Sequence, residues 1–511
     1  MPHRTVQTTS PTTPRRGPPA STDADTPCER PRRMRHGPVV ARSSDMLALL
    51  DFKHAITNAE QVLSSWTPST PLCQWAGVNC SRTHTDRVAV LNLAGQSLTG
   101  TLSPSLGNLT FLRALNLSAN HFTGHLPDLS HLRRLEVLDL SINALQGVIP
   151  DTLMNCSDLK ELILAHNSLV GEIPFKIGLL SKLSILSLGE NNLTGVIPSS
   201  LNNTQLKGIS LPDNQLTGSI PHELGHLSNL SVLHLGGNML SGEFPTILIN
   251  MSSLRSLDLG ENELRGTLPS DIGSALHKLV DLVLYANNFE GQIPISIGDA
   301  LGLKHLDLSD NKFTGEIPTS LGRLTELVVL NLELNNLEAS DSKSWEFLYA
   351  LKNCTYLNVL ALDGNWLSGT IPNYIGELSP QLEYLLLGNN NLSGIVPSSI
   401  GNFTSLMNLG LSNNKLIGTI GEWIGKPKKL QNLELEQNNF DGPIPSSIGN
   451  LTQLAKLYLA QNNFNGTIPT SLAYLQQLSV WIFPAIIYMV SYRQGFSVSK
   501  HWQFVVCRTT N

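Results

Sequence analysis

One five-residue stretch has the residue types and spacing of a catalytic metal site. Residues 222–226 read HELGH, which matches the H-E-x-x-H pattern of zinc peptidases. That chemistry requires both histidines on one face of a helix, a third protein ligand, and the glutamate as general base. Gly225 weakens a helix, and no third ligand lies at close spacing. The Leu-Gly pair at 224–225 recurs at 321–322, so we interpret it as part of a repeated pattern and expect no metal and no cofactor.

Other catalytic signatures are missing from the sequence. It contains no G-x-S-x-G nucleophile elbow, no phosphate-binding loop and none of the protein-kinase motifs. Scattered carboxylates such as Asp139 and Glu161 would need a closed pocket to shift their pKa values for acid–base catalysis. We therefore expect a protein that is not an enzyme.

The candidate residues are set in a repeat with the pattern LxLxxNxLxGxIP. One copy is residues 306–318, LDLSDNKFTGEIP, and copies recur about every 24 residues from Leu91 to Pro469. Fifteen copies have Asn in the same slot, and a first copy has Gln96 there. Self-similarity at this period predicts an α/β leucine-rich-repeat solenoid of about sixteen repeats.

The residue types at each position of the repeat follow from its geometry. Alternating leucines form a short strand with one face inward, and the amide of the following Asn can satisfy backbone groups in a buried bend. Gly permits a tight bend, and Pro fixes φ where the chain leaves it. Stacked repeats make the core continuous, so we expect a concave parallel β-sheet roughly 75 Å long.

The side chains at the outward strand positions do not pack in the core, so these residues are the candidate ligand-binding residues. An aromatic residue flanked by histidines and acids is a grouping to which peptides bind. The alternative for any single residue of the group is an ordinary solvated side chain. The first candidate group is His234, Asp258, Asp281, Val283, Tyr285, His305, Asp307 and Glu333, and a second is Tyr384 and Leu386.

Charge is unevenly distributed along the 511 residues. The net charge is −6, but residues 1–42 contribute +5, which leaves −11 for the remainder. An acidic solenoid argues against a nucleic-acid partner and favours a neutral or basic peptide. Residues 1–42 are rich in Arg, Pro and Thr and are predicted to be a disordered tail; the Arg cluster at 30–35 could also be a nuclear-localisation patch.

Residues 43–82 are predicted to form a cap on the first repeat. Ser44-Asp45 is a helix N-cap pair, and apolar residues follow at helical spacing. Cys73 and Cys80 lie seven apart around a Trp, just before the solenoid. A solenoid needs its open edge covered, so we predict a disulfide-stapled helical cap, the alternative being two free thiols.

Two stretches resemble a known family. Residues 45–56, DMLALLDFKHAI, and 73–80, CQWAGVNC, resemble the N-terminal cap of plant leucine-rich-repeat receptor kinases, and the Gly-x-Ile-Pro repeat is the plant-specific type. An insert at 336–352, in the 30-residue step from Asn335 to Asn365, is similar to one in the immune-receptor subfamily that contains the rice bacterial-blight resistance receptor. Within it, Trp345, Leu348 and Leu351 are spaced for a short helix.

The resemblance covers residues 43 to about 478 and implies a function. Relatives bind a peptide or protein ligand on the concave face of an extracellular domain at the plasma membrane, recruit a co-receptor kinase ectodomain and act in plant defence signalling. The alternatives are a secreted leucine-rich-repeat inhibitor of microbial cell-wall hydrolases and a receptor gene fragment without function.

The chain departs from the family's pattern at both ends. From these residues we expect no signal peptide, no second cysteine cap, no transmembrane helix and no Ser/Thr kinase domain. Residues 479–511 are predicted to be a divergent C-terminal tail, because the register breaks after Leu478 and the apolar run to Val490 is too short to span a bilayer.

Asn-x-Ser/Thr sequons are abundant, which favours a secretory history. Asn79 is doubtful because it adjoins Cys80, and a glycan on Asn116 would block the early strand face. The predicted N-glycosylation sites are Asn108, Asn116, Asn155, Asn192, Asn202, Asn229, Asn250, Asn353, Asn391, Asn402, Asn450 and Asn465.

Overall fold

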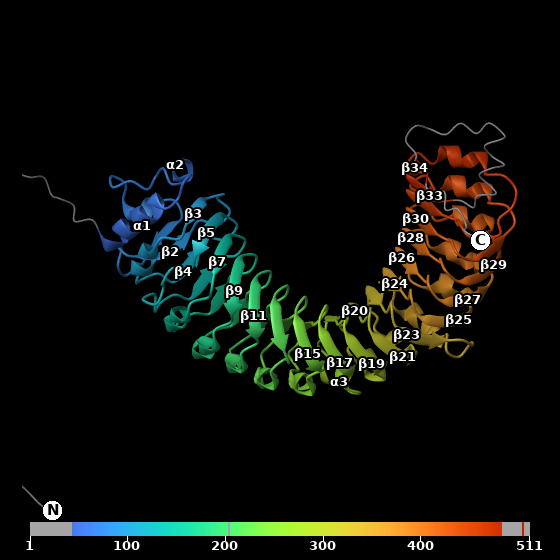
Figure 1. The fold of residues 1–511 in the computed structure, drawn as a ribbon, viewed down its shortest axis with the longest axis horizontal. Coiled ribbons are helices and arrows are strands. Elements are labelled where there is room, and N and C mark those ends of the chain that lie inside the picture. Colours follow the sequence, from blue (N-terminus) through green and yellow to red (C-terminus); the bar gives the residue numbers. More distant parts are fainter. Residues whose placement is uncertain (1–42, 203–204, 483–502, 505–511) are drawn as a thin grey trace, which may run out of the picture. The chain divides into compact units, whose positions relative to one another are not determined.

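The computed structural model describes residues 43–202, 205–482 and 503–504, so the predicted tail at 1–42 and most of the predicted tail at 479–511 lie outside the described residues. The described chain is a leucine-rich-repeat solenoid, as predicted, and its turns stack into a curved array with two sheets (Figure 1). None of its helices is long and apolar enough to cross a membrane.

The larger sheet lines the concave side, and its described part has 19 strands. After an antiparallel start between β1 and β2, every pairing is parallel, and the strand leucines lie opposite one another, as with Leu282 and Leu306. The strands are β1 Val78–Cys80, β2 Val88–Asn92, β4 Ala114–Asn116, β6 Val137–Asp139, β8 Glu161–Ile163, β10 Ile185–Ser187, β12 Gly208–Ser210, β14 Val232–His234, β16 Ser256–Asp258, β18 Asp281–Val283, β20 His305–Asp307, β22 Val329–Asn331, β24 Val359–Ala361, β26 Tyr384–Leu386, β28 Asn408–Gly410, β30 Asn432–Glu434, β32 Lys456–Tyr458, β33 Val480–Ile482 and β34 Gln503–Phe504.

A second parallel sheet of 15 described strands follows the Asn of each repeat. The repeat's Gly lies within it at positive φ, as at Gly315 with φ 78°, which explains why that slot is glycine. The strands are β3 Thr99–Thr101, β5 His121–His125, β7 Ala144–Gly147, β9 Ser168–Glu172, β11 Asn192–Val196, β13 Gln215–Gly218, β15 Met239–Glu243, β17 Glu263–Thr267, β19 Asn288–Gln292, β21 Lys312–Glu316, β23 Asn336–Ala339, β25 Trp366–Thr370, β27 Asn391–Gly394, β29 Lys415–Thr419 and β31 Asn439–Asp441.

Short helices return the chain from the second sheet to the next concave strand. Most are 3-10 turns that begin after the proline of Ile-Pro, as Pro318 precedes η9. The α-helices are α1 Ser44–His54, α2 Ala59–Val62, α3 Ile272–Ala275 and α4 Glu346–Ala350. The 3-10 helices are η1 Leu72–Gln74, η2 Pro104–Asn108, η3 Asp151–Asn155, η4 Phe175–Leu179, η5 Ser199–Leu201, η6 His222–His226, η7 Thr246–Asn250, η8 Ile295–Asp299, η9 Thr319–Arg323, η10 Leu351–Asn353, η11 Asn373–Glu377, η12 Ser398–Asn402, η13 Glu422–Gly425, η14 Ser446–Asn450 and η15 Thr470–Tyr474.

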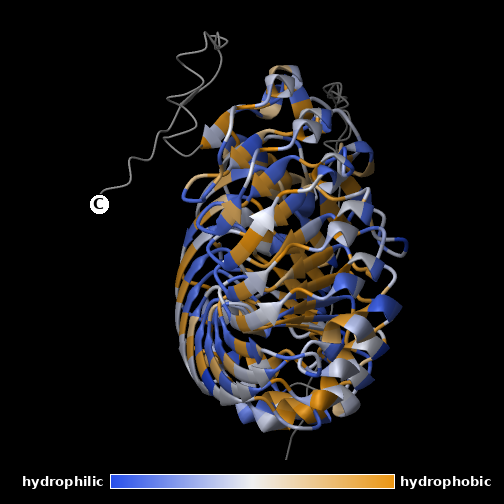
Figure 2. Ribbon diagram, turned by 90° about the vertical axis from the view of Figure 1, so that its right-hand side faces the viewer, coloured by the Kyte–Doolittle hydropathy of each residue, from blue (hydrophilic) through white to orange (hydrophobic). Residues whose placement is uncertain are grey.

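One continuous core fills the space between these elements. Leu306 and Leu308 are fully buried, and Phe289 stacks on Phe313 of the next repeat with ring centroids 6.4 Å apart. Hydrophobic and hydrophilic residues alternate along the strands in Figure 2, as expected when one strand face is buried. Because each repeat buries its leucines only against its neighbours, the repeats depend on stacking for stability.

The repeat asparagine has the role that its position predicted. Asn311 accepts a hydrogen bond from the Phe289 N–H of the preceding repeat at 2.9 Å. Its amide nitrogen donates to the carbonyl oxygens of Leu284 in that repeat and of Leu308 and Ser309 in its own. The same pattern recurs at all fifteen repeat asparagines from Asn120 to Asn462, and we call this column the asparagine ladder.

The N-terminal cap is helical, but its first turn differs from the prediction. Ser43, not Ser44, is the N-cap, because its hydroxyl accepts a hydrogen bond from the Met46 N–H. Asp45 is fully buried and serves a different purpose: its carboxylate accepts from the Val88 N–H at 2.8 Å and pairs with Arg87 at 3.0 Å. A buried, fully bonded carboxylate thus fastens the cap to the first strand of the solenoid.

The predicted disulfide between Cys73 and Cys80 is present, with Cα atoms 5.5 Å apart. Trp75 lies within the disulfide loop and stacks on Trp66 with centroids 5.3 Å apart. The indole N–H of Trp66 donates to the Ala76 carbonyl. Disulfide and stacked indoles together cover the first repeat's open edge.

Two regions of the solenoid deviate from the regular repeat. The insert contains helix α4 at Glu346–Ala350, where a short helix was expected. Beyond Leu478, where we predicted the register to break, β33 continues the concave sheet with Trp481 opposite Leu457, and β34 pairs in parallel with β33. Trp481 is buried in the slot that leucine occupies elsewhere, so an aromatic side chain substitutes for the consensus residue.

Replacing Asn311 by Ala should lower the free energy of unfolding by about 2–4 kcal/mol, because it leaves one N–H and several carbonyl groups of the buried bend without partners. Chemical denaturation of the purified chain measures this loss. Lys312→Ala, one residue further along on an exposed side chain, is the control and should change stability by less than about 0.5 kcal/mol. Equal losses in the two variants would contradict the role assigned to the ladder.

Candidate functional site

The outward side chains of the concave sheet form straight rows across successive strands. Pairing places His234 beside Asp258, Asp258 beside Val283, and Val283 beside Asp307. Because neighbouring strands lie about 4.8 Å apart, these side chains form one continuous surface. The first predicted group is therefore brought together, from β14 to β22.

A second row holds Asp281 and His305 side by side. The His305 Nδ1 lies 2.6 Å from Asp281 Oδ1, and both side chains remain partly exposed to solvent. His234 makes a different contact, because its Nε2 lies 2.8 Å from the Ser256 hydroxyl. Each histidine is thus held by a polar neighbour on the adjacent strand.

The carboxylates of this surface are partly occupied by local hydrogen bonds. Asp258 accepts from the Gly260 N–H at 3.0 Å. Asp307 accepts from the N–H and hydroxyl of Ser309 and from the Asn331 amide. These bonds orient the acids along the sheet, so their positions are fixed before any ligand arrives.

Tyr285 is the aromatic residue at the centre of the group. Its hydroxyl donates to Glu261 at 2.9 Å. Its ring lies over Gly260, where an added Cβ would come within 2.4 Å of the ring. Burial and the bond to Glu261 raise the pKa of Tyr285 to about 12, so it stays a neutral phenol. A glycine floor and a carboxylate therefore hold a half-buried ring in one orientation.

The acids of the concave strands have histidines among their strand neighbours, but no lysine or arginine. The strand residues from β4 to β30 include no Lys and no Arg. Burial raises the pKa of Asp258 and of Glu333, and nearby Asp307 adds to both shifts. A face whose carboxylates raise one another's pKa values favours cationic or hydrogen-bond-donating ligands.

Sequence reasoning missed a second acidic group, which lies on the strands and turns around β24 to β30. Burial, with Glu333 and Glu434 nearby, raises the pKa of Asp363 to about 7. One buried oxygen of Asp363 and one of Glu436 have no hydrogen-bond partner in the described structure. The same reading of outward positions, continued past Glu333, would have found these residues.

The second predicted group lies beside these acids and not beside Tyr285. Tyr384 and Leu386 belong to β26, where they pair with Asn408 and Gly410 of β28. Four strand steps separate β18 from β26, which is roughly 19 Å. The two predicted groups are therefore separate contact regions on one surface.

The HELGH motif has the geometry of an ordinary repeat segment. Residues 222–226 form η6, and Leu224 is buried in the core. A 3-10 helix has three residues per turn, so residues four apart do not share a face. Among the described residues, no group of three or more His, Cys, Asp or Glu side chains could hold a metal ion.

The predicted glycosylation sites differ in exposure. The side chain of Asn116 is half-buried on β4 and accepts bonds from Ser118, whereas the other eleven asparagines are exposed. Seven of them end or directly follow a 3-10 helix, as Asn108 ends η2. Glycans at those positions would leave the concave sheet uncovered.

Replacing Asp363 by Asn should flatten the pH dependence of stability. The folded chain holds this proton up to about pH 7, whereas an ordinary Asp loses it near 3.8, so stability falls as pH rises between those values. Compared with the Asp363→Asn variant, the wild type should lose roughly 2–4 kcal/mol of its free energy of unfolding as the pH rises from 3.8 to about 7. Thermal and urea unfolding over the range measure this, with exposed Asp86→Asn as control. Parallel curves for all three proteins would refute the assignment.

Known sequence families match most of the repeat region. Residues 42–81 match the leucine rich repeat N-terminal domain. Residues 112–169, 181–240 and 380–440 match the leucine rich repeat family, and residues 253–275, 302–324 and 453–475 match a second leucine rich repeat family.

Individual plant proteins extend the similarity. The chain is 49% identical over 89 residues to the LRR receptor-like serine/threonine-protein kinase EFR of Arabidopsis thaliana, which is 17% of this chain and 8% of that protein. It is 45% identical over 85 residues to the receptor kinase-like protein Xa21 of Oryza sativa subsp. japonica, which is 16% of this chain and 8% of that protein. These matches span less than a tenth of either relative.

A solved structure covers much more of the chain. The Arabidopsis receptor kinase HAESA, solved in complex with the peptide hormone IDA and the co-receptor SERK1, is 31% identical, with a TM-score of 0.68. The superposition covers 86% of this chain and 82% of that one. The protein described here belongs to the family of leucine-rich-repeat ectodomains of plant receptor kinases.

Proposed function

We propose that this chain is a non-catalytic recognition module that binds a peptide on its concave face. The observation that carries the proposal is the fixed ring of Tyr285, which is held over Gly260 by Glu261 although the core does not need it. Asp281 and His305 add an oriented polar pair in another row of the same sheet. A rigid aromatic anchor surrounded by polar side chains is the usual centre of a peptide contact.

The similar ectodomain of HAESA supports this proposal, because it was solved with a peptide hormone and a co-receptor. By analogy, a co-receptor ectodomain is the second partner that we propose. The resemblance of the insert to that of the immune-receptor subfamily adds a proposed role in plant defence signalling. The proposed location is the extracellular side of the plasma membrane.

Tyr285→Ala should abolish retention of the ligand. We would immobilise the full chain, pass the peptide fraction of plant extracellular fluid over it, and identify retained peptides by mass spectrometry. Loss of the ring should weaken binding by at least about thirtyfold, which corresponds to a hot-spot contribution of about 2 kcal/mol. Tyr474→Ala removes an exposed tyrosine on η15, away from the concave sheet, and is the matched control. Retention of the same peptides by both variants would disprove the proposed site.

Extracellular placement predicts glycans on the exposed sequons. The chain expressed in plant cells should migrate faster on a gel after enzymatic removal of N-glycans, because several exposed asparagines would each carry a bulky sugar. Replacing exposed Asn250 and Asn402 by Gln should reduce that shift in proportion, whereas Asn116→Gln should have a smaller effect. Unchanged mobility after digestion would contradict passage through the secretory pathway.

A further inference from the structure

Three exposed side chains lie in register on the second sheet, beside the insert. Glu316 at the end of β21 pairs with Glu338 of β23, and Glu338 pairs with Trp366 of β25. All three face solvent. Two strand steps separate the first residue from the last, which is about 10 Å. We call these three residues the flank strip.

Two other acids of this sheet lie opposite a cation, whereas the two glutamates of the flank strip do not. Glu243 lies opposite Arg265, and Glu290 lies opposite Lys312. Glu316 and Glu338 instead lie opposite each other, and neither forms an ion pair with a described residue. Like charges directly opposite on a sheet repel, so a cation from outside would relieve an unfavourable contact.

Trp366 adds an aromatic face to this charge. Its side chain is 54% exposed, although the same slot of neighbouring strands holds the polar residues Asn336, Asn391 and Lys415. The core therefore does not require a large apolar side chain there. An exposed indole next to an unpaired carboxylate is a favourable place for a guanidinium group, which can stack on the ring and bond to the acid.

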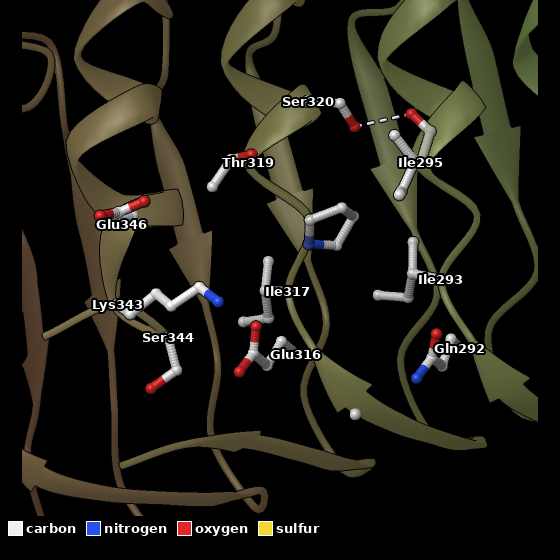
Figure 3. A pocket seen from close by; sticks show the side chains of 12 residues that line it. Gln292, Ile293, Ile295, Glu316, Ile317, Thr319, Ser320, Lys343, Ser344 and Glu346 are labelled. Carbon is white, nitrogen blue, oxygen red and sulfur yellow. Dashed lines mark hydrogen bonds between the residues drawn. The ribbon is translucent and has the colours of Figure 1, made fainter. Parts of the chain in front are cut away.

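A hollow adjoins the strip at its Glu316 end (Figure 3). It has a volume of about 500 Å³, and Ile293 and Ile317 contribute apolar lining. Ile295 at its edge is 70% exposed. Lys343 and Glu346 of the insert line the side opposite Ile293 in Figure 3. The insert thus supplies a wall that the regular repeat lacks.

That wall is firmly anchored to the solenoid. The buried Trp345 donates its indole N–H to the Ser368 carbonyl of β25 and stacks on Phe347. Tyr374 donates its hydroxyl to the Trp345 carbonyl. The hollow and the strip are therefore fixed relative to each other, as a preformed binding surface requires.

We propose that the flank strip and its hollow form a docking surface for a partner protein, distinct from the concave peptide site. The occupant is an extended segment with an aliphatic side chain in the hollow and an arginine over Trp366, bonded to Glu338. An extended chain advances about 3.3 Å per residue and alternates its side chains between two faces, so two side chains that contact the same surface across this strip stand four residues apart, about 13 Å. Charge complementarity selects the basic segment, since the strip presents two unpaired carboxylates.

Predicted glycans leave this surface accessible. The sequence has no sequon between Asn250 and Asn353. The nearest one on the same sheet is Asn391, which pairs with Ser368 on the far side of Trp366. A glycan there would border the strip without covering Glu316 or the hollow.

Two synthetic peptides test the proposal, with sequence Gly-Leu-Gly-Gly-Gly-Arg-Gly and the same sequence with citrulline for arginine, both with blocked ends. Ligand-observed NMR with the full chain measures weak binding. The arginine peptide should bind at least about fivefold more tightly than the citrulline peptide, which has the same shape without the charge. Trp366→Ala and Glu338→Gln should each abolish that difference. Equal or undetectable binding of both peptides to the wild type would overturn the proposal.

Control variants separate this surface from the concave one. Glu290→Gln removes an exposed carboxylate of the same sheet that already faces Lys312, so it should preserve the preference for arginine. Tyr285→Ala should preserve it as well, since Tyr285 belongs to the concave face. Loss of the preference in Tyr285→Ala would mean that the peptide binds there instead, and would refute the flank site. Thermal unfolding checks that Trp366→Ala and Glu338→Gln stay folded.

Discussion

The asparagine ladder is the constraint on which the rest of the structure depends. Each ladder side chain bonds the backbone of its own repeat and of the one before it, so it fixes the pitch between turns. The preceding residue adopts positive φ in most repeats, as Asp310 does at 50°, which costs roughly 1–3 kcal/mol for a non-glycine residue. Four hydrogen bonds in a buried bend offset that strain.

Because the spacing between repeats is constant, the outward side chains of successive strands align into an ordered surface. On the concave sheet this spacing aligns acids on strands from β4 to β30 that carry no lysine or arginine, and it places Tyr285 over the backbone of Gly260. On the second sheet it sets Glu316 opposite Glu338, whereas Glu290 of that sheet lies opposite Lys312. Both candidate surfaces thus arise from what the ladder holds in register, and neither needs a closed pocket.

The sequence predicts the solenoid well because leucine and asparagine recur at one spacing. Each has one role, since the leucines pack in the core and the asparagines bond to the backbone of the bend. It predicts long-range pairs poorly. Asp45 looked like a helix cap, but its partner is the N–H of Val88, 43 residues away. Likewise the raised pKa of Asp363 depends on Glu333 and Glu434 of other repeats. Trp481 fills a leucine slot, so a pattern search confined to leucine ends the sheet before β33.

The insert has a consequence for how such a protein can diversify. The step from Asn335 to Asn365 is longer than the usual one, yet Val329 and Val359 still pair in register on the concave sheet. All the additional chain is accommodated after β23, where it forms α4 and the wall of the flank hollow. The side of the solenoid that follows the second sheet can therefore gain residues by insertion, whereas the concave sheet changes only by point substitution. The two proposed binding surfaces can in this way be altered independently within a single polypeptide.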